Sequence, residues 1–193
     1  MVFTNGISKE EIRQMPRERF EGQILVVETA EKLNEAIAYL SGCKEIGFDT
    51  ETRPSFSKNT HYKMSLLQFS SNDKCFLIRL NKFEKMPVKL EDFLKNDSVR
   101  KIGLSLRDDF HGLHFVTRIS PDNFIDLQKY VTQFGIEDMS LQKIYAILFH
   151  KRISKRERLS NWDNGTLTEA QKMYAAIDAW ACLRIYQYLE GNK

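Results

Sequence analysis

The sequence has few cysteines and no long apolar run. Its three cysteines, Cys43, Cys75 and Cys182, lie far apart, and none belongs to a C-x-x-C pair. This usage argues against a disulfide framework or a zinc site and fits a reducing compartment. The N-terminal residues lack the apolar region of a signal peptide, and no stretch of about 18 apolar residues occurs. We therefore expect a soluble, cytoplasmic protein without a membrane partner.

The sequence also lacks internal repeats and low-complexity linkers. Its 193 residues are enough for one well-buried domain, and 42% apolar with 28% charged residues is ordinary for a globular protein. The net charge of +3 permits an anionic partner without requiring one. Residues 1–20 are polar and are predicted to form an N-terminal extension, and residues 21–193 are predicted to form one domain.

Hydrophobic periodicity predicts alternating strands and helices. Strands are expected over residues 23–29, 45–51, 63–71, 74–80, 100–106 and at the start of 123–131. Helices are expected over residues 8–15, 30–42, 87–96, 107–116, the end of 123–131, 139–149 and 168–189. Strands clustered early, with helices interleaved afterwards, indicate an α/β domain with a mixed sheet.

Two acidic residues end the predicted strand EIGFDTE. Asp49 and Glu51 are two apart, so both carboxylates point to the same face of the strand. Like charges this close destabilise each other unless a cation lies between them. Taken alone, the pair fits a strand end that meets water better than half of a metal site.

A third acidic residue lies in the stretch KIGLSLRDDFHGLHF. On a helix, Asp109 shares a face with the apolar residues Leu106, Phe110 and Leu113, whereas Asp108 lies on a more polar side. Because desolvating a charge is expensive, Asp109 needs a partner. Taken alone, it fits a half-exposed residue paired with a basic neighbour on the same helix.

The last predicted helix contains Tyr174 and Asp178, which are four residues apart and therefore lie on one helical face. The alanines around them, Ala175, Ala176 and Ala179, leave room for another backbone or a ligand to approach closely. Taken alone, the pair fits a core helix in which the tyrosine hydroxyl binds the aspartate.

Together, these three stretches resemble the three exonuclease motifs of the DEDD superfamily, in its tyrosine subclass. The segment MSLLQFSSNDKCFLI is similar to the second and third strands of the RNase D and Werner-type exonuclease domain. The segment LSNWDNGTLTEAQKMYAAIDAWA is similar to that family's S-N-W … L-T-x-x-Q-x-x-Y-A-A-x-D-A signature. The resemblance extends over about residues 22–190.

The resemblance implies a ribonuclease H-like α/β fold, with helices on both faces of a mixed five- or six-stranded sheet whose first three strands are antiparallel. It also implies hydrolysis of nucleotides from a 3′ end by a two-metal mechanism. Four carboxylates without a histidine or cysteine ligand suit two Mg²⁺ or Mn²⁺ ions. Asp49 would bridge both ions, Glu51 and Asp178 would hold mainly the first, and Asp109 the second. Tyr174 would orient the attacking water.

Contacts with nucleic acid are predicted from the basic run KRISKRER, residues 151–158, which has five lysines and arginines. Lys155, Arg156 and Arg158 are candidate phosphate ligands, and a solvated loop is an equal alternative. Trp162 follows this run and is a candidate either for shaping the catalytic edge or for the core.

The sequence departs from its relatives after the D-x-E motif. Relatives commonly have an aromatic residue there, whereas Thr52 and Arg53 follow Glu51 here. Arg53 is a candidate phosphate ligand in place of an aromatic contact with the terminal base. Only residues 190–193 follow Leu189, so we expect substrate choice not to follow from the additional domains of RNase D or the Werner protein.

The sequence therefore predicts a metal-dependent 3′–5′ exonuclease that acts on a single-stranded 3′ end of DNA or RNA. The competing hypothesis is a non-catalytic module that keeps the fold and binds nucleic acid or protein. An RNase H-like endonuclease is disfavoured, because Tyr174 and the exonuclease signature would have no role in it. The choice between DNA and RNA and the oligomeric state stay open.

Overall fold

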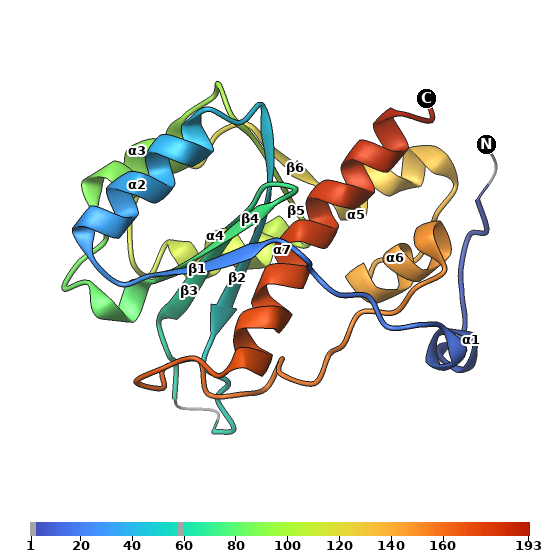
Figure 1. Cartoon of the computed structure of the whole chain (residues 1–193), viewed down its shortest axis with the longest axis horizontal. Coiled ribbons are helices and arrows are strands. Elements are labelled where there is room, and N and C mark those ends of the chain that lie inside the picture. Colours follow the sequence, from blue (N-terminus) through green and yellow to red (C-terminus); the bar gives the residue numbers. More distant parts are fainter. Residues whose placement is uncertain (1–2, 58–59) are drawn as a thin grey trace.

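A computed structural model describes residues 3–57 and 60–193 of the chain. It contains a six-stranded sheet with the order β1-β4-β3-β2-β5-β6 (Figure 1). The strands are β1 (Gln23–Val27), β2 (Glu45–Thr52), β3 (Met64–Ser70), β4 (Lys74–Arg79), β5 (Arg100–Gly103) and β6 (Phe124–Asp126). β3 is antiparallel to both of its neighbours, β2 and β4, whereas β1 pairs in parallel with β4, β5 with β2, and β6 with β5. The predicted mixed α/β sheet is confirmed, but its antiparallel run consists of the second to fourth strands in the chain, because β1 joins the edge of the sheet in parallel.

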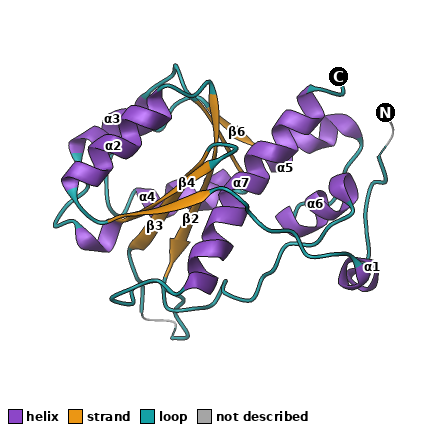
Figure 2. Cartoon of the chain, viewed as in Figure 1, coloured by secondary structure: helices purple, strands orange, loops and turns teal. Residues whose placement is uncertain are grey.

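Helices cover both faces of the sheet (Figure 2). One face packs against α2 (Ala30–Ser41), α3 (Val88–Lys95) and α4 (Leu106–Leu113). The other face packs against α5 (Leu127–Tyr130), α6 (Leu141–Phe149) and α7 (Glu169–Glu190). The short helices η1 (Leu80–Lys82) and η2 (Val131–Phe134) connect these elements, and α1 (Lys9–Gln14) precedes them.

The central strand β3 separates the two cores. All of its residues are buried, because helices cover both of its faces. Leu66 packs in the core beneath α7, and Leu67 and Phe69 pack in the core beneath α2 and α3. This alternation follows from the period of two along a strand. Leu66 and Leu67 are therefore core residues on opposite faces of the sheet.

The close contact between β2 and α7 depends on a glycine. A Cβ on Gly47 would lie 1.8 Å from the backbone oxygen of Ala179, so no other residue fits without moving the helix. Ala175 and Ala179 are fully buried on the α7 side of this contact. The small residues of the last helix therefore admit another backbone, which is one of the alternatives their pattern indicated.

The N-terminal segment packs onto the domain. Helix α1, predicted over residues 8–15, begins with a capping box between Ser8 and Glu11, and its Ile12 is 4% exposed. Farther along, the buried carboxylate of Glu18 accepts hydrogen bonds from Tyr145 and Arg184. The domain boundary at residue 21 stays a prediction, and residues 1 and 2 lie outside the described part. Among the described residues, no helix combines the length and apolar character that a membrane crossing needs.

Candidate active site

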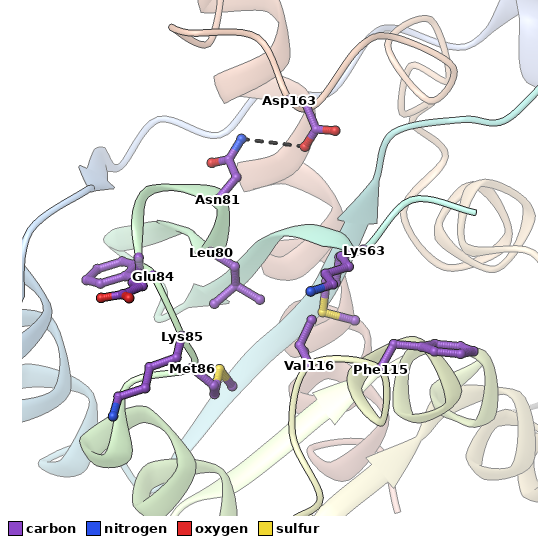
Figure 3. Close-up of a pocket in the computed structure, with 11 residues that line it drawn as sticks. Lys63, Leu80, Asn81, Glu84, Lys85, Met86, Phe115, Val116 and Asp163 are labelled. Carbon is purple, nitrogen blue, oxygen red and sulfur yellow. Dashed lines mark hydrogen bonds between the residues drawn. The ribbon is translucent and has the colours of Figure 1, made fainter. Parts of the chain in front are cut away.

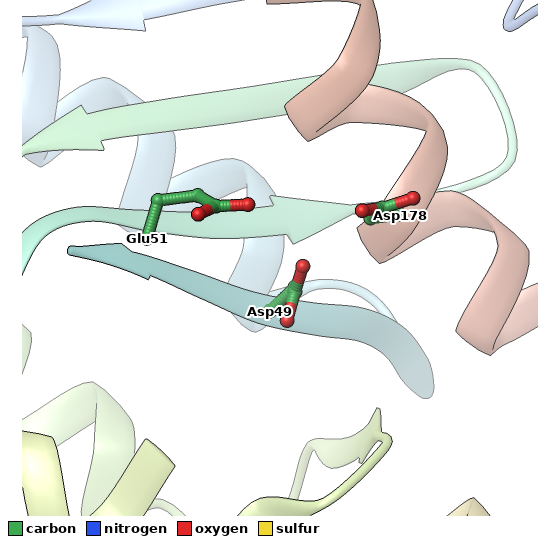
Figure 4. A group of neighbouring side chains, drawn as sticks. All are labelled: Asp49, Glu51 and Asp178. Atoms are coloured by element: carbon green, nitrogen blue, oxygen red, sulfur yellow. The ribbon is translucent and has the colours of Figure 1, made fainter. Parts of the chain in front are cut away.

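Three carboxylates converge between β2 and α7 (Figure 4). Gly47, Asp49 and Glu51 alternate along β2 and therefore share the face that α7 covers. Asp178 projects from α7 toward the same space. Ligand oxygens of Asp49, Glu51 and Asp178 all lie within 4.8 Å of one another. The structure thus brings together two motifs that are far apart in the sequence.

The electrostatics of this cluster oppose ionisation in the absence of a cation. Burial and the charges of Asp178 and Asp109 raise the pKa of Glu51 to about 9. Burial raises the pKa of Asp178 to about 7, although a hydrogen bond from Tyr174 acts in the opposite direction. Burial and the three neighbouring carboxylates also raise the pKa of Asp49 well above its usual range. Such a cluster favours the binding of a positive charge.

The fourth predicted carboxylate, Asp109, lies on α4 and is turned toward β2. Its Oδ1 accepts a hydrogen bond from the hydroxyl of Thr50, and it is not one of the three clustered residues. Burial raises its pKa to about 7. Asp108, by contrast, is 73% exposed and pairs with Arg107. The predicted helix faces of Asp108 and Asp109 are therefore confirmed, and within residues 3–57 and 60–193 neither Arg107 nor a histidine forms an ion pair with Asp109.

Asp126 holds the start of α4 in place, a role that was not predicted from the sequence. The Asp126 carboxylate accepts hydrogen bonds from the backbone N–H groups of Ser105 (3.1 Å) and Leu106 (3.0 Å) at the start of α4. Ser105 itself has a left-handed backbone with φ 63°. Because non-glycine residues rarely adopt this conformation, the turn into α4 is strained. An acidic residue at the end of β6, next to β5, was the available signal for this cap.

Tyr174 lies against the acidic cluster and in front of Trp162. The two rings have centroids 5.9 Å apart, and Trp162 is 1% exposed. This burial corrects the candidate role of Trp162 in binding nucleic acid, because its side chain is covered by the core. It confirms the alternative that Trp162 belongs to the core, where its ring packs against Tyr174. Within the described residues, its indole N–H has no hydrogen-bond partner.

The cluster opens into a cleft of about 400 Å³ between β2, α7 and the segment before α6. Lys155 and Arg158 line this cleft together with Asp49, Glu51 and Tyr174. Their charges act on the cluster, because Lys155 opposes the raised pKa of Asp178 and Arg158 opposes that of Glu51. Arg156 is exposed and is not part of the lining. Two of the three basic candidates are therefore at the cleft.

Arg53 lies in the loop that follows β2 and stacks on a tyrosine. Its guanidinium carbon is 4.5 Å from the centroid of the Tyr62 ring. Both residues line a second hollow with Phe56, which is 87% exposed. An aromatic side chain therefore accompanies Arg53 in space, although none follows Glu51 directly in the sequence.

Another hollow, of about 370 Å³, lies beside the start of β3 and the residues that follow β4 (Figure 3). Its lining combines apolar residues such as Leu80 and Val116 with Lys63, Glu84 and Asp163. Asp163 is already bonded to Ser65 at 2.7 Å. None of the four predicted catalytic carboxylates lines this hollow, so the candidate reaction site is the cleft at β2 and α7.

Comparisons with known proteins agree with this geometry. The chain is 32% identical over 158 residues to the mouse (Mus musculus) bifunctional 3′-5′ exonuclease/ATP-dependent helicase WRN, over 79% of this chain and 11% of that protein. Its fold is similar to that of the Aedes aegypti Nibbler EXO domain, with a TM-score of 0.81, 21% identity, and coverage of 90% of this chain and 91% of that one. It is also similar to Trypanosoma brucei RNase D in complex with RNA U12, with a TM-score of 0.77, 24% identity, and coverage of 90% and 64%.

These similarities confirm the ribonuclease H-like fold that the sequence predicts. The match with the mouse relative spans only 11% of that protein's length. Residues 24–192 match the profile of a family described as 3′-5′ exonuclease. Over these residues the chain belongs to the 3′–5′ exonuclease family.

Proposed function

We propose that this chain hydrolyses nucleotides from the 3′ end of a single nucleic-acid strand as a metal-dependent member of the DEDD tyrosine subclass. The observation that carries the proposal is the convergence of Asp49, Glu51 and Asp178 within 4.8 Å, with Tyr174 beside them in one cleft. Among solved relatives, the Trypanosoma brucei RNase D structure contains RNA. A strand of the same kind fits the basic rim of this cleft.

The donor set fits divalent magnesium or manganese. The four acidic residues offer only oxygen ligands, which these hard cations prefer. Burial raises the pKa values of all four carboxylates, and repulsion from the other carboxylates of the site raises those of Asp49 and Glu51 further, so a cation would relieve a real electrostatic cost. Asp49, Glu51 and Asp178 would hold one ion, and Asp49 with Asp109 the other. Bound there, two such ions would supply an activated water and stabilise the leaving 3′ oxygen.

Tyr174 would orient the attacking water rather than take its proton. Burial and the negative charges of Asp178 and Glu51 raise the pKa of its phenol far above the usual range, so the hydroxyl keeps its proton. A protonated phenol donates a hydrogen bond and cannot accept a proton at neutral pH. Trp162 fixes the ring from behind by packing against it.

Lys155 and Arg158 would hold phosphates of the strand at the mouth of the cleft, because both line it and both are exposed. Arg156 would contact the strand only outside the cleft. Arg53, stacked on Tyr62, would offer a guanidinium and an aromatic face near the end of β2.

The test is degradation of 5′-labelled single-stranded DNA and RNA with Mg²⁺ or Mn²⁺, followed as a ladder of shortened products. We expect a ladder with at least one of the metals, and no ladder on any substrate would exclude an exonuclease and favour the non-catalytic module.

The matched variants are Asp109→Asn and Asp108→Asn. The first removes a carboxylate beside the cluster, so we expect a loss of at least about 100-fold in rate, as for other changes close to a metal. The second changes an exposed neighbour on the other helix face and should leave the rate unchanged. The reverse result would contradict the assigned roles.

A further inference from the structure

The N-terminal helix α1 lies outside residues 24–192, which match the exonuclease family, yet it is fixed to the domain. The Asn5 carbonyl accepts a hydrogen bond from the N–H of Glu137 at 2.9 Å, and the N–H of Ile7 donates to Asp138 at 3.0 Å. After the helix, the Met15 carbonyl accepts from the Arg152 guanidinium at 2.9 Å. Both ends of α1 are therefore held against the segments that flank α6.

A hollow of about 580 Å³ lies between α1 and the segments around α6, and its walls are basic. Five basic side chains line it against a single acidic one, Asp138. The basic residues are Lys9 and Arg13 on α1, Lys143 on α6, and Arg152 and Lys155 on the segment after α6. We call this hollow the basic groove. It concentrates positive charge in a protein whose net charge is only +3.

The basic groove adjoins the catalytic cleft. Ser140, Gln142 and Lys155 line both hollows, so the two are direct neighbours. Burial and the charges of Arg158, Lys9 and Lys143 lower the pKa of Lys155, although Asp178 acts in the opposite direction. Cations from α1, from α6 and from the cleft thus act on one lysine at the junction.

Several of these charges are free to meet a ligand. Lys143 pairs with Asp138 at 2.7 Å, and the Arg152 guanidinium is bound to a backbone carbonyl. Arg13 makes only a 3.9 Å contact with Glu10, and its side chain is 76% exposed. Within the described residues, Lys9 and Lys155 have no ionic partner. A groove that is polar, open and rich in unneutralised cations suits a polyanion rather than an apolar segment.

We propose that the basic groove binds the phosphate backbone of the substrate strand on the 5′ side of the scissile bond. The proposal rests on the proposed exonuclease function. An exonuclease that removes single nucleotides has one nucleotide beyond the scissile bond, so a longer run of phosphates that leaves the cleft lies on the 5′ side. Lys9 and Arg13 give the N-terminal extension a role in holding long substrates, and the reaction itself does not need them.

The test compares a dinucleotide with a single strand of about 20 nucleotides, which is longer than one binding site. The variant is Lys9→Glu/Arg13→Glu, and Lys9→Gln/Arg13→Gln removes the charges without reversing them. We expect kcat/KM for the long strand to fall about 10-fold in the Glu variant and less in the Gln variant. The value for the dinucleotide should stay unchanged.

Binding gives a readout that does not need catalysis. Affinity for the long strand is measured in the presence of a chelator at several salt concentrations. Losing two phosphate contacts should reduce the slope of log affinity against log salt by about 1.4, because each contact on a single strand contributes about 0.7. The matched control is Lys32→Glu/Lys89→Glu, which reverses two exposed lysines on α2 and α3 and should change neither measurement.

Three results would overturn the proposal: equal losses on the dinucleotide and the long strand, an unchanged salt slope, or equal competition by a polyglutamate peptide of the same charge. The last would identify a general anion surface. An inactive wild-type protein that still binds the long strand through Lys9 and Arg13 would instead refute the exonuclease function alone.

Discussion

Two catalytic roles are distinguishable for Tyr174: orienting the attacking water and accepting its proton. Its phenol is fixed between Trp162 and the carboxylates, and it stays protonated because those carboxylates oppose its ionisation. For Tyr174→Phe we expect a fall in kcat of about 100-fold, at the lower end of the range for a positioned catalytic side chain.

The pH dependence tests which role the phenol has. If Tyr174 only orients water, the shape of the kcat profile against pH should be the same in Tyr174→Phe and in the wild type. The loss of one limb of the profile in the variant would identify the phenol as the base. Titration with Mn²⁺ serves as the control, because both proteins keep all four carboxylates and should bind the ion alike.

Among single residues, the sequence best predicts those whose partners lie at a fixed spacing along the same strand or helix. The convergence of Asp49, Glu51 and Asp178 follows from the period of a strand and of a helix, combined with the resemblance. Thr50 and Asp126 were missed because their partners are distant in sequence: Thr50 bonds Asp109 across 59 residues, and Asp126 bonds Ser105 across 21. Trp162 was placed only as an open choice, since an indole suits a core and a stacking surface equally well.

Among the elements, the contact between β2 and α7 determines where Asp178 lies. Gly47→Ala would place a methyl group 1.8 Å from the Ala179 carbonyl oxygen, so α7 must move away from β2. We expect the free energy of unfolding to fall by about 3 kcal/mol, the upper range for overpacking. We also expect activity to fall, since Asp178 moves with the helix.

Calorimetry measures the change in unfolding free energy, and the ladder assay measures the change in activity. A second glycine provides the control for both measurements. A Cβ on Gly42, at the end of α2, would lie 3.4 Å from the Tyr39 carbonyl oxygen, and its φ is −83°. Gly42→Ala should therefore change stability by no more than about 0.5 kcal/mol. Equal effects of the two substitutions would contradict the assigned close contact.

The helices and strands themselves were largely predictable from the sequence, whereas the pairing of the strands in the sheet was less so. The predicted helices over residues 8–15 and 168–189 are found as α1 and α7, and each begins with a capping box, a pattern of residues three apart that is readable in the sequence. The strand predicted over residues 23–29, observed as β1 (Gln23–Val27), had no predicted partner. Its parallel pairing with β4 at the sheet edge is set by packing across the whole domain, which no local pattern records.

For the whole molecule, the raised carboxyl pKa values link stability to pH. The folded, metal-free protein binds protons more tightly at Glu51 and Asp178 than the unfolded chain does, with pKa values near 9 and 7 against ordinary values of 4.5 and 3.8. Because the folded state then carries more protons, the free energy of unfolding falls as pH rises from about 4 to 9.

We therefore expect the Tm of the chelated protein to fall between pH 5 and 9, by several degrees. Divalent cations bind the ionised carboxylates, so Mg²⁺ or Mn²⁺ should raise Tm most at the alkaline end. Asp178→Asn removes one of the repelling charges and should raise Tm in chelator while reducing the effect of the metal. A Tm that rises with pH in chelator would contradict the electrostatics described for the cluster.

The distance along the chain between β2 and α7 also has a consequence for folding kinetics. Asp49 lies on the second strand and Asp178 on the last helix. Bringing the two carboxylates together therefore closes a loop that spans most of the sequence. Such long-range contacts form late, after local helices and hairpins. Enzymatic activity is therefore a late marker of folding: a chain with its hairpins formed but α7 undocked has all its secondary structure and no catalyst.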